Sequence, residues 1–274
     1  MNSEMFCKLC RSETTYKFSL PLVNNIQGDY FECKNCQMLQ SYHLDSMSPE
    51  GMADFYELDS ELSLDCGSAW RQYCIMNRVE HLVRLKIVPD LSGNHKMLDF
   101  GCGSGFVVSA LRSEFKWNTF GYEPYAEATF SSDRVFQNWE AVVQNGSYSL
   151  IIASEVFEHF TNPEQQIIKI RDVLAREYAF VYITTGLYVP DKRGKDWNYL
   201  VPQSGQHVAF YSHKTMRKVR ELLGATSIYQ VGAEYEWLFV RLPSSASQLA
   251  RARFSATAAF LRAAVGLGIL KKIL

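Results

Sequence analysis

Short apolar segments alternate with amphipathic helical patterns through the middle of the chain. The helix after residue 162 begins with Asn162 as a cap and Pro163 in its first turn, and its apolar residues recur at helical spacing. The segments that are short and apolar enough to form strands are residues 96–100, 118–124, 134–137, 148–153, 178–184, 226–231 and 234–242. Strands that alternate with helices predict an α/β fold around one sheet.

The first of these strands ends in an acid and runs into a glycine-rich turn, with the sequence DFGCGSG. Glycine adopts backbone angles that are closed to other residues and lets a ligand approach the main chain, and Ser104 is placed to cap the next helix. A dinucleotide-binding turn has the spacing G-x-G-x-x-G, whereas this turn is G-x-G-x-G with Asp99 before it. A carboxylate there repels phosphates and accepts hydrogen bonds from a cationic amino-acid ligand. The pattern favours S-adenosylmethionine over NAD, and an ordinary glycine-rich turn is the alternative.

Polar residues at the ends of the next two strands extend this site. Glu123 lies in the segment GYEP, where a carboxylate can hold both hydroxyls of a ribose; a solvated carboxylate is the alternative. Asn138 and Trp139 follow the third strand, at the edge where an adenine would lie. Trp139 would cover the base and Asn138 would bond to it, with packing and helix capping as the alternatives.

Two C-x-x-C pairs lie near the start of the chain, among short segments with strand character at 18–21, 30–33 and 38–42. Each pair is a thiolate clamp for tetrahedral zinc, and four thiolates fill the coordination sphere, so we expect a structural site. The alternatives are disulfides, reduced thiols or a redox pair. No signal peptide is recognisable and the total of 7 cysteines is odd, which favours a reducing compartment and zinc. The expected ligands are Cys7, Cys10, Cys33 and Cys36.

The motifs DFGCGSG, GYEP and SEVFEHF, in this order and spacing, resemble those of the class I S-adenosylmethionine-dependent methyltransferases over residues 95–242. The resemblance implies a Rossmann-like seven-stranded sheet that ends in an antiparallel hairpin. It also implies that the glycine turn contacts the amino-acid part of the cofactor, that Glu123 binds the ribose and that Glu155 lines the pocket. The expected cofactor-binding residues are Asp99, Gly101, Cys102, Gly103, Gly105, Glu123, Pro124, Asn138, Trp139 and Glu155.

Four parts of the chain follow from this interpretation. In order, they are a zinc-binding module (1–45), a helical lid or linker (46–94), the methyltransferase domain (95–243) and a basic amphipathic helical tail (244–274). Helices before the first strand often cover the cofactor in this family, so Tyr56, Tyr73 or Arg78 would reach its carboxylate. Packing is the alternative role of these three side chains.

The long connection after the fifth strand, residues 185–212, is the expected acceptor region, because loops of this length in compact domains are usually functional. Its aromatic rings and amides suit sugar faces and hydroxyls, and Trp197 and Tyr199 are the candidates for a stacking platform. His207 is the candidate base, since imidazole titrates near neutral pH. His159, after the fourth strand, is the competing candidate, and a histidine that only organises the loop is the alternative.

A cysteine-pair module before a methyltransferase domain is also similar to the sugar C-methyltransferases that act on nucleotide-linked deoxysugars. Those enzymes usually continue into a third domain, for which these 274 residues have no counterpart. We therefore expect direct methyl transfer to a hydroxyl of a sugar, nucleotide-sugar or glycan. The alternatives are C- or N-methylation of a sugar or other small metabolite, and a cofactor-binding scaffold without catalysis.

Composition and charge narrow the expected partners and location. The net charge of −1 argues against a nucleic-acid partner, and no apolar run is long enough to span a membrane, so we expect a cytoplasmic protein. After Glu236 the chain has no acid, and its basic residues alternate with apolar ones. This pattern predicts a helix that packs on its own domain or in an oligomer contact, with peripheral contact to the inner face of a membrane as the alternative.

Overall fold

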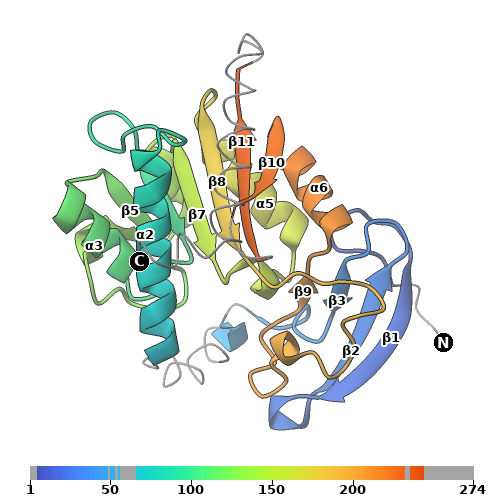
Figure 1. The fold of residues 1–274 in the computed structure, drawn as a ribbon. Coiled ribbons are helices and arrows are strands. Elements are labelled where there is room, and N and C mark those ends of the chain that lie inside the picture. The colour runs from blue at the N-terminus through green and yellow to red at the C-terminus, as the bar shows by residue number, and fades with distance from the viewer. Residues whose placement is uncertain (1–4, 49, 53–54, 56–65, 232–234, 244–274) are drawn as a thin grey trace. The chain divides into compact units, whose positions relative to one another are not determined.

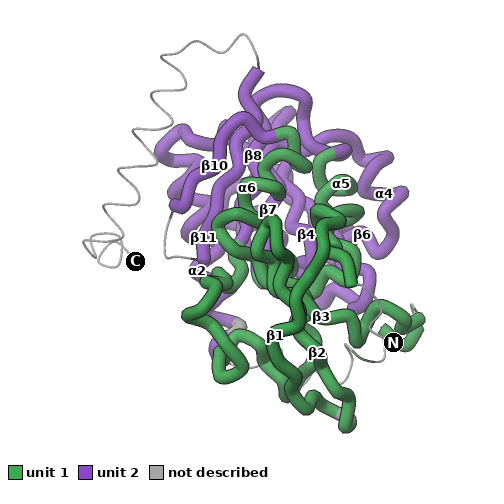
Figure 2. The backbone as a smooth tube through the Cα atoms, turned by 90° about the vertical axis from the view of Figure 1, so that its right-hand side faces the viewer, with its two compact units in different colours: residues 1–59, 155–171, 184–224 green, residues 60–154, 172–183, 225–274 purple. Residues whose placement is uncertain are grey.

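The computed structural model describes residues 5–48, 50–52, 55, 66–231 and 235–243 (Figure 1). Residues 244–274, the predicted basic tail, and Tyr56 lie outside these ranges. The chain forms two compact units, namely residues 1–59, 155–171 and 184–224 in the first and residues 60–154, 172–183 and 225–274 in the second (Figure 2). Each unit is thus assembled from segments that are distant in sequence, and each has its own β-sheet.

A seven-stranded sheet forms the second unit. Its strands are β4 (Met97–Phe100), β5 (Thr119–Tyr122), β6 (Val135–Phe136), β7 (Leu150–Ser154), β8 (Ala179–Thr184), β10 (Ser227–Gln230) and β11 (Glu236–Arg241). The strand order is β10-β11-β8-β7-β4-β5-β6. β4 pairs in parallel with β5 and β7, β5 pairs in parallel with β6, and β10 and β11 form an antiparallel hairpin. The predicted α/β class and the seven-stranded Rossmann-like sheet are therefore confirmed.

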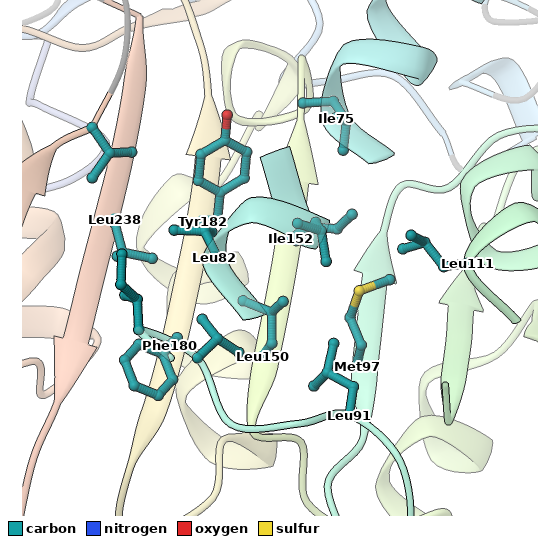
Figure 3. Packing of buried hydrophobic residues seen from close by; sticks show 14 of the residues in the cluster. Ile75, Leu82, Leu91, Met97, Leu111, Leu150, Ile152, Phe180, Tyr182 and Leu238 are labelled. Carbon is teal, nitrogen blue, oxygen red and sulfur yellow. The ribbon is translucent and has the colours of Figure 1, made fainter. Parts of the chain in front are cut away.

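The helical elements of the second unit are α2 (Cys66–Arg84), α3 (Phe106–Phe115) and α4 (Trp139–Gln144), with a short 3-10 turn, η3 (Ser132–Arg134). α2 and α3 pack on the sheet through one hydrophobic cluster (Figure 3). Ile75, Val79 and Leu82 recur at helical spacing along α2 and belong to the same buried cluster as Met97 of β4 and Leu150 of β7. Each such side chain stabilises the fold by about 1.5–3 kcal/mol when it is fully buried, so this contact fixes α2 on the sheet.

The first unit is built on a four-stranded antiparallel sheet, whose order is β1-β2-β3-β9. These strands are β1 (Thr14–Pro21), β2 (Gln27–Cys33), β3 (Leu39–Ser41) and β9 (Ala209–Phe210). The helical elements that begin in this unit are η1 (Val23–Asn25), η4 (Phe157–His159), α5 (Pro163–Val173), η5 (Asn198–Leu200) and α6 (His213–Leu222). Because β9 comes from the connection after β8, residues 185–212 and the cysteine module belong to one compact unit. Within the described ranges, no helix has the length and hydropathy required to cross a bilayer.

A buried ion pair joins α2 to β11 inside the second unit. Arg78 donates from Nε to Glu236 Oε2 at 2.8 Å and from Nη2 to Oε1 at 3.2 Å, and the Tyr182 hydroxyl donates to Oε2 at 2.9 Å. The Arg78 and Glu236 side chains are only 13% and 10% exposed. The guanidinium that we considered for the cofactor carboxylate is therefore engaged with Glu236.

We expect Arg78→Ala to lower the free energy of unfolding by about 3–5 kcal/mol, because it leaves the Glu236 carboxylate buried without its cation. Arg84→Ala is the matched control: Arg84 is 72% exposed and pairs with Glu80 one helical turn away, so its loss should cost at most about 1 kcal/mol. Urea unfolding of both variants measures the difference. Equal losses would contradict a special role of the buried pair.

Candidate functional site

The glycine turn after β4 has a backbone shape that requires glycine. Gly101, Gly103 and Gly105 have φ angles of 76°, 50° and 78°, in the left-handed region that side chains disfavour. The backbone N–H groups of Gly101 and Cys102 donate to the Tyr122 carbonyl at 2.8 and 3.2 Å. Gly105 stands at the N-cap position of α3, so the prediction that Ser104 caps this helix is wrong.

Close contacts explain why two positions around the turn, Gly105 and Gly121, are occupied by glycine. A Cβ atom on Gly105 would lie 2.4 Å from the Phe130 carbonyl oxygen, and one on Gly121 would lie 2.5 Å from the Cys102 sulfur. Burial raises the pKa of the Cys102 thiol. Cys102 is thus a buried thiol packed against β5, and it lacks the lowered pKa of an activated nucleophile.

Asp99 and Glu123 place two buried carboxylates beside the turn. Glu123 accepts hydrogen bonds from Gly103 N and Tyr125 N, both at 3.0 Å, and its oxygens keep further lone pairs for hydroxyl donors. Burial, and then the charge of Glu123, raise the pKa of Asp99 to about 7; burial also raises the pKa of Glu123. Among the described residues, no cationic side chain offsets either shift. The pair is therefore suited to a cationic ligand.

Trp139 and Asn138 lie at the start of α4, in the same unit as the glycine turn. The Trp139 ring contacts the rings of Phe100 and Tyr122, with centroids 5.8 and 5.2 Å apart. Asn138 caps α4, because its Oδ1 accepts a hydrogen bond from Ala141 N at 2.9 Å. In the structure Trp139 packs against aromatic rings and Asn138 caps a helix. The contact of either residue with an adenine stays a prediction. Pro124, which follows Glu123, is exposed.

The four predicted zinc ligands meet in the first unit. All four sulfurs lie within 4.8 Å of one another, with Cys7 and Cys36 3.6 Å apart and Cys10 and Cys33 3.4 Å apart. These separations exclude S–S bonds. They are close to the roughly 3.8 Å between sulfurs on a tetrahedral zinc ion with bonds of about 2.3 Å. The residues present therefore fit a closed four-thiolate metal site.

Both C-x-x-C pairs form the same turn. The residue after each pair has positive φ, 58° at Arg11 and 60° at Gln37, and donates its N–H to the carbonyl of the first cysteine, at 3.0 and 3.1 Å. Backbone N–H groups also point at sulfur, as in the 3.4 Å bond from Leu9 N to Cys7 Sγ. Two matching turns thus aim four sulfurs at one point.

The connection after β8 is held by the cysteine module. β9 pairs with β3, with Phe210 opposite Leu39, and Ser41 N donates to the Val208 carbonyl at 2.9 Å. Val208 N in turn donates to the Glu158 carbonyl at 2.8 Å. Beyond β9, the hydroxyls of Ser212 and Thr215 both donate to the Cys36 carbonyl at 2.9 Å. The module therefore fixes both ends of the segment that carries His207.

Tyr199 bridges two carboxylates in the same unit. Its hydroxyl lies 2.9 Å from Glu155 Oε2 and within hydrogen-bond distance of Glu158 Oε1, and the Thr184 hydroxyl donates to Glu155 Oε1 at 2.9 Å. Burial, and then the charge of Glu155, raise the pKa of the fully buried Glu158. A phenol has one proton to donate, so Tyr199 can satisfy only one of the two carboxylates at a time, and ionisation is costly for the buried Glu158.

His207 and His159 lie beside this bridge. His207 Nδ1 donates to the Tyr199 carbonyl at 2.6 Å, which leaves Nε2 with the lone pair of a neutral ring. The two imidazole rings are nearly perpendicular, with centroids 4.8 Å apart. Burial lowers the pKa of both histidines. The structure therefore brings the two candidate catalytic histidines together in a place where burial disfavours their charged forms.

The sequence-based analysis did not single out Glu158 or the bridging role of Tyr199. Tyr199 and Trp197, the predicted stacking platform, are partly buried against the cluster of Tyr30, Leu39, Tyr188, Leu200 and Phe210. Glu155 has a positive φ of 54°, a strained backbone for a non-glycine residue of the kind that gathers at functional sites. The E-x-x-E-H spacing in SEVFEHF could have indicated Glu158. A short 3-10 turn at Phe157–His159 keeps Glu158 and His159 close to Glu155 in the chain.

The sheet order, the glycine turn and the buried carboxylates define a class I S-adenosylmethionine-dependent methyltransferase domain. Residues 71–230, more than half of the 274 residues, match the family model described as a methyltransferase domain, and the chain belongs to this family. No curated protein matches the chain.

Solved structures of methyltransferases resemble the chain at low identity. An O-methyltransferase family protein from Burkholderia thailandensis is 11% identical, with 74% of this chain and 75% of that chain covered and a TM-score of 0.44. DesVI from Streptomyces venezuelae is 14% identical over 70% and 98% of the two chains, also with a TM-score of 0.44. A SAM-dependent methyltransferase from Archaeoglobus fulgidus is 13% identical over 66% and 80%, with a TM-score of 0.44. Values this low carry no argument about the acceptor.

We expect the stability of the cofactor-free protein to fall as the pH rises from about 4 to about 7 through Asp99. The pKa of Asp99 is about 7 in the fold, whereas that of an unperturbed aspartic acid is 3.8, so the fold favours the protonated form and that stability is lost on ionisation. Asp99→Asn removes this dependence. Urea unfolding at pH 5 and pH 8 should show the variant gaining about 2–3 kcal/mol on the wild type between the two pH values, because the unfolded carboxyl is already mostly ionised at pH 5. Parallel pH profiles would refute the assignment.

If the four-cysteine site holds a metal ion, substitution of its cysteines should abolish metal binding. Replacing Cys10 and Cys33 by serine should remove one tightly bound zinc ion per chain and the thiolate-to-metal absorption of the cobalt-substituted protein, because a closed site needs all four thiolates. Cys74→Ser is the matched control, since Cys74 is a free thiol outside the cluster. Wild-type protein that carries no metal as purified and has these cysteines paired in disulfides would contradict the prediction.

Proposed function

We propose that this methyltransferase transfers the methyl group of S-adenosylmethionine to a hydroxyl of a sugar, a nucleotide-sugar or a glycan. The observation that carries the proposal is the cluster around Tyr199, where the buried Glu158, the half-buried Glu155 and two imidazoles gather on the segments that follow β7 and β8. Groups of this kind bind hydroxyls and accept protons at neutral pH. An apolar acceptor would instead call for an apolar lining.

The donor side of the reaction rests on the glycine turn of the second unit. We assign the ammonium group of the cofactor to the neighbourhood of Asp99, because this buried carboxylate gains a compensating charge when a cation binds. Glu123 is assigned to the ribose, since its two oxygens keep lone pairs beyond the bonds from Gly103 and Tyr125. Trp139 is assigned to the adenine, next to Phe100 at the end of β4.

The acceptor side rests on His207. Its Nδ1 is held by the Tyr199 carbonyl, so the imidazole has one orientation and one tautomer in which Nε2 accepts. Methyl transfer to oxygen releases the hydroxyl proton, and a neutral imidazole assists this loss without a large pKa adjustment. His159 stands beside it as the second candidate.

The four-thiolate site supplies rigidity to this arrangement. We propose a structural zinc ion at Cys7, Cys10, Cys33 and Cys36, which would fix the turn from which β3 starts. Through the pairing of β3 with β9 and the bonds of Ser212 and Thr215 to Cys36, the same turn holds the segment that carries His207. The ion has no open position for substrate, so its role is in positioning.

The test is transfer of a labelled methyl group to a panel of nucleotide-sugars and glycans. We expect a methylated hydroxyl in the product, and we expect His207→Ala to lower kcat by about 10²–10⁴-fold while calorimetric binding of S-adenosylmethionine is unchanged. His213→Ala, at the exposed start of α6, is the control. Methylation at carbon or nitrogen, or cofactor binding without turnover on any acceptor, would contradict the proposal.

A further inference from the structure

Three metal-ligating side chains meet in the first unit, apart from the four cysteines. The ligand atoms of Glu158, His159 and His207 all lie within 4.8 Å of one another. Because His207 Nδ1 is bonded to the Tyr199 carbonyl, Nε2 is the ring atom with a lone pair. Metal-binding imidazoles characteristically donate their other N–H to a carbonyl or carboxylate, which fixes the tautomer and the ring orientation.

The Glu158 carboxylate has one oxygen that accepts no hydrogen bond from the part of the chain that the structure describes. Oε1 accepts from Tyr199, whereas Oε2 is buried and has no hydrogen-bond partner among the described residues. Glu158 has 0% of its surface exposed. Burial of such an oxygen is costly unless a proton or a cation meets it. The second carboxylate on Tyr199, that of Glu155, adds negative charge to the same place.

We propose that Glu158, His159 and His207 bind a divalent transition-metal cation. Two imidazoles and one carboxylate suit Zn²⁺, Fe²⁺, Co²⁺ and Mn²⁺, whereas four thiolates select zinc and exclude harder ions. Three protein ligands also leave coordination positions open. We assign these positions to the acceptor hydroxyl, and this assignment rests on the proposed function.

A cation at this cluster explains how the acceptor is activated. Coordination lowers the pKa of a bound hydroxyl, so its O–H bond breaks and the proton passes to solvent. The oxygen then forms a bond to the methyl carbon, while the carbon–sulfur bond of the donor breaks and leaves a neutral thioether. In this scheme the Nε2 lone pair of His207 binds the cation, so coordination of the hydroxyl replaces the imidazole as the cause of its ionisation, and Tyr199 is a positioning residue that holds Glu158.

Titration with Mn²⁺ tests the site, because Mn²⁺ prefers nitrogen and oxygen ligands to thiolates. The full-length chain is dialysed against a chelator until it retains one equivalent of zinc, and Mn²⁺ binding is followed by electron paramagnetic resonance and calorimetry. We expect one Mn²⁺ per chain in addition to the zinc. Failure of the wild type to bind Mn²⁺ overturns the proposal.

Three variants separate a specific site from adventitious binding. His207→Ala and Glu158→Gln should weaken Mn²⁺ binding by more than about 100-fold, and Glu158→Gln keeps an acceptor for the Tyr199 hydroxyl if the fold depends on that bond. His213→Ala, which removes an exposed histidine of α6, should bind Mn²⁺ like the wild type. Unchanged affinity in His207→Ala or Glu158→Gln overturns the proposal.

Methyl transfer by the same preparations separates this proposal from the proposed function. Transfer that requires Mn²⁺ or another divalent cation besides the retained zinc supports both. Transfer at the full rate without such a cation overturns the metal site and leaves the methyltransferase assignment intact. Stoichiometric Mn²⁺ binding without transfer to any acceptor supports the metal site and contradicts the proposed acceptor class.

Discussion

Buried carboxylate charge without a matching cation is the constraint on which both candidate sites depend. In the second unit, burial and the charge of Glu123 raise the pKa of Asp99, burial raises the pKa of Glu123, and no cationic side chain among the described residues offsets either shift. In the first unit, the buried Glu158 and the half-buried Glu155 both lie within hydrogen-bond distance of the Tyr199 hydroxyl, which has a single proton to donate. The fold elsewhere pairs such charges, as Arg78 does for Glu236. Unpaired buried charge therefore marks where a ligand is to supply the missing cation.

Rigid elements hold these charges in place at a cost in backbone strain. The glycine turn has positive φ at three positions, and a Cβ atom at Gly105 would collide with the Phe130 carbonyl. Glu155 has positive φ without being glycine. In the first unit the cysteine turns support β3, β3 pairs with β9, and this pairing fixes the segment that carries His207. The four-cysteine module and the cluster around Tyr199 and His207 are thus parts of one framework.

Features with a local signal could be predicted from the sequence, and features that depend on distant contacts could not. The sheet, the glycine turn and the four-cysteine site follow from apolar runs, glycine spacing and C-x-x-C pairs. The two-residue strand β9 has no pattern of its own and exists only because β3 lies beside it. The Tyr199 bridge joins residues more than 40 positions apart, and it requires Gly186, where a Cβ atom would lie 2.3 Å from the Tyr199 ring. At the start of α3, the N-cap is Gly105 and not Ser104; Gly105 has a left-handed backbone and lies against the Phe130 carbonyl, a contact that the local sequence does not reveal.

The central claim is that Asp99, beside the glycine turn, is a buried carboxyl that ionises when a cationic ligand binds. The most direct test is the number of protons exchanged when S-adenosylmethionine binds. Calorimetry near pH 7 in buffers of different ionisation enthalpy measures this number. Because the pKa of Asp99 is about 7 in the cofactor-free fold, binding of a cation should ionise this carboxyl, so the wild type should release protons that Asp99→Asn does not release. Binding of S-adenosylmethionine with the same affinity and the same proton exchange in both proteins would contradict the account.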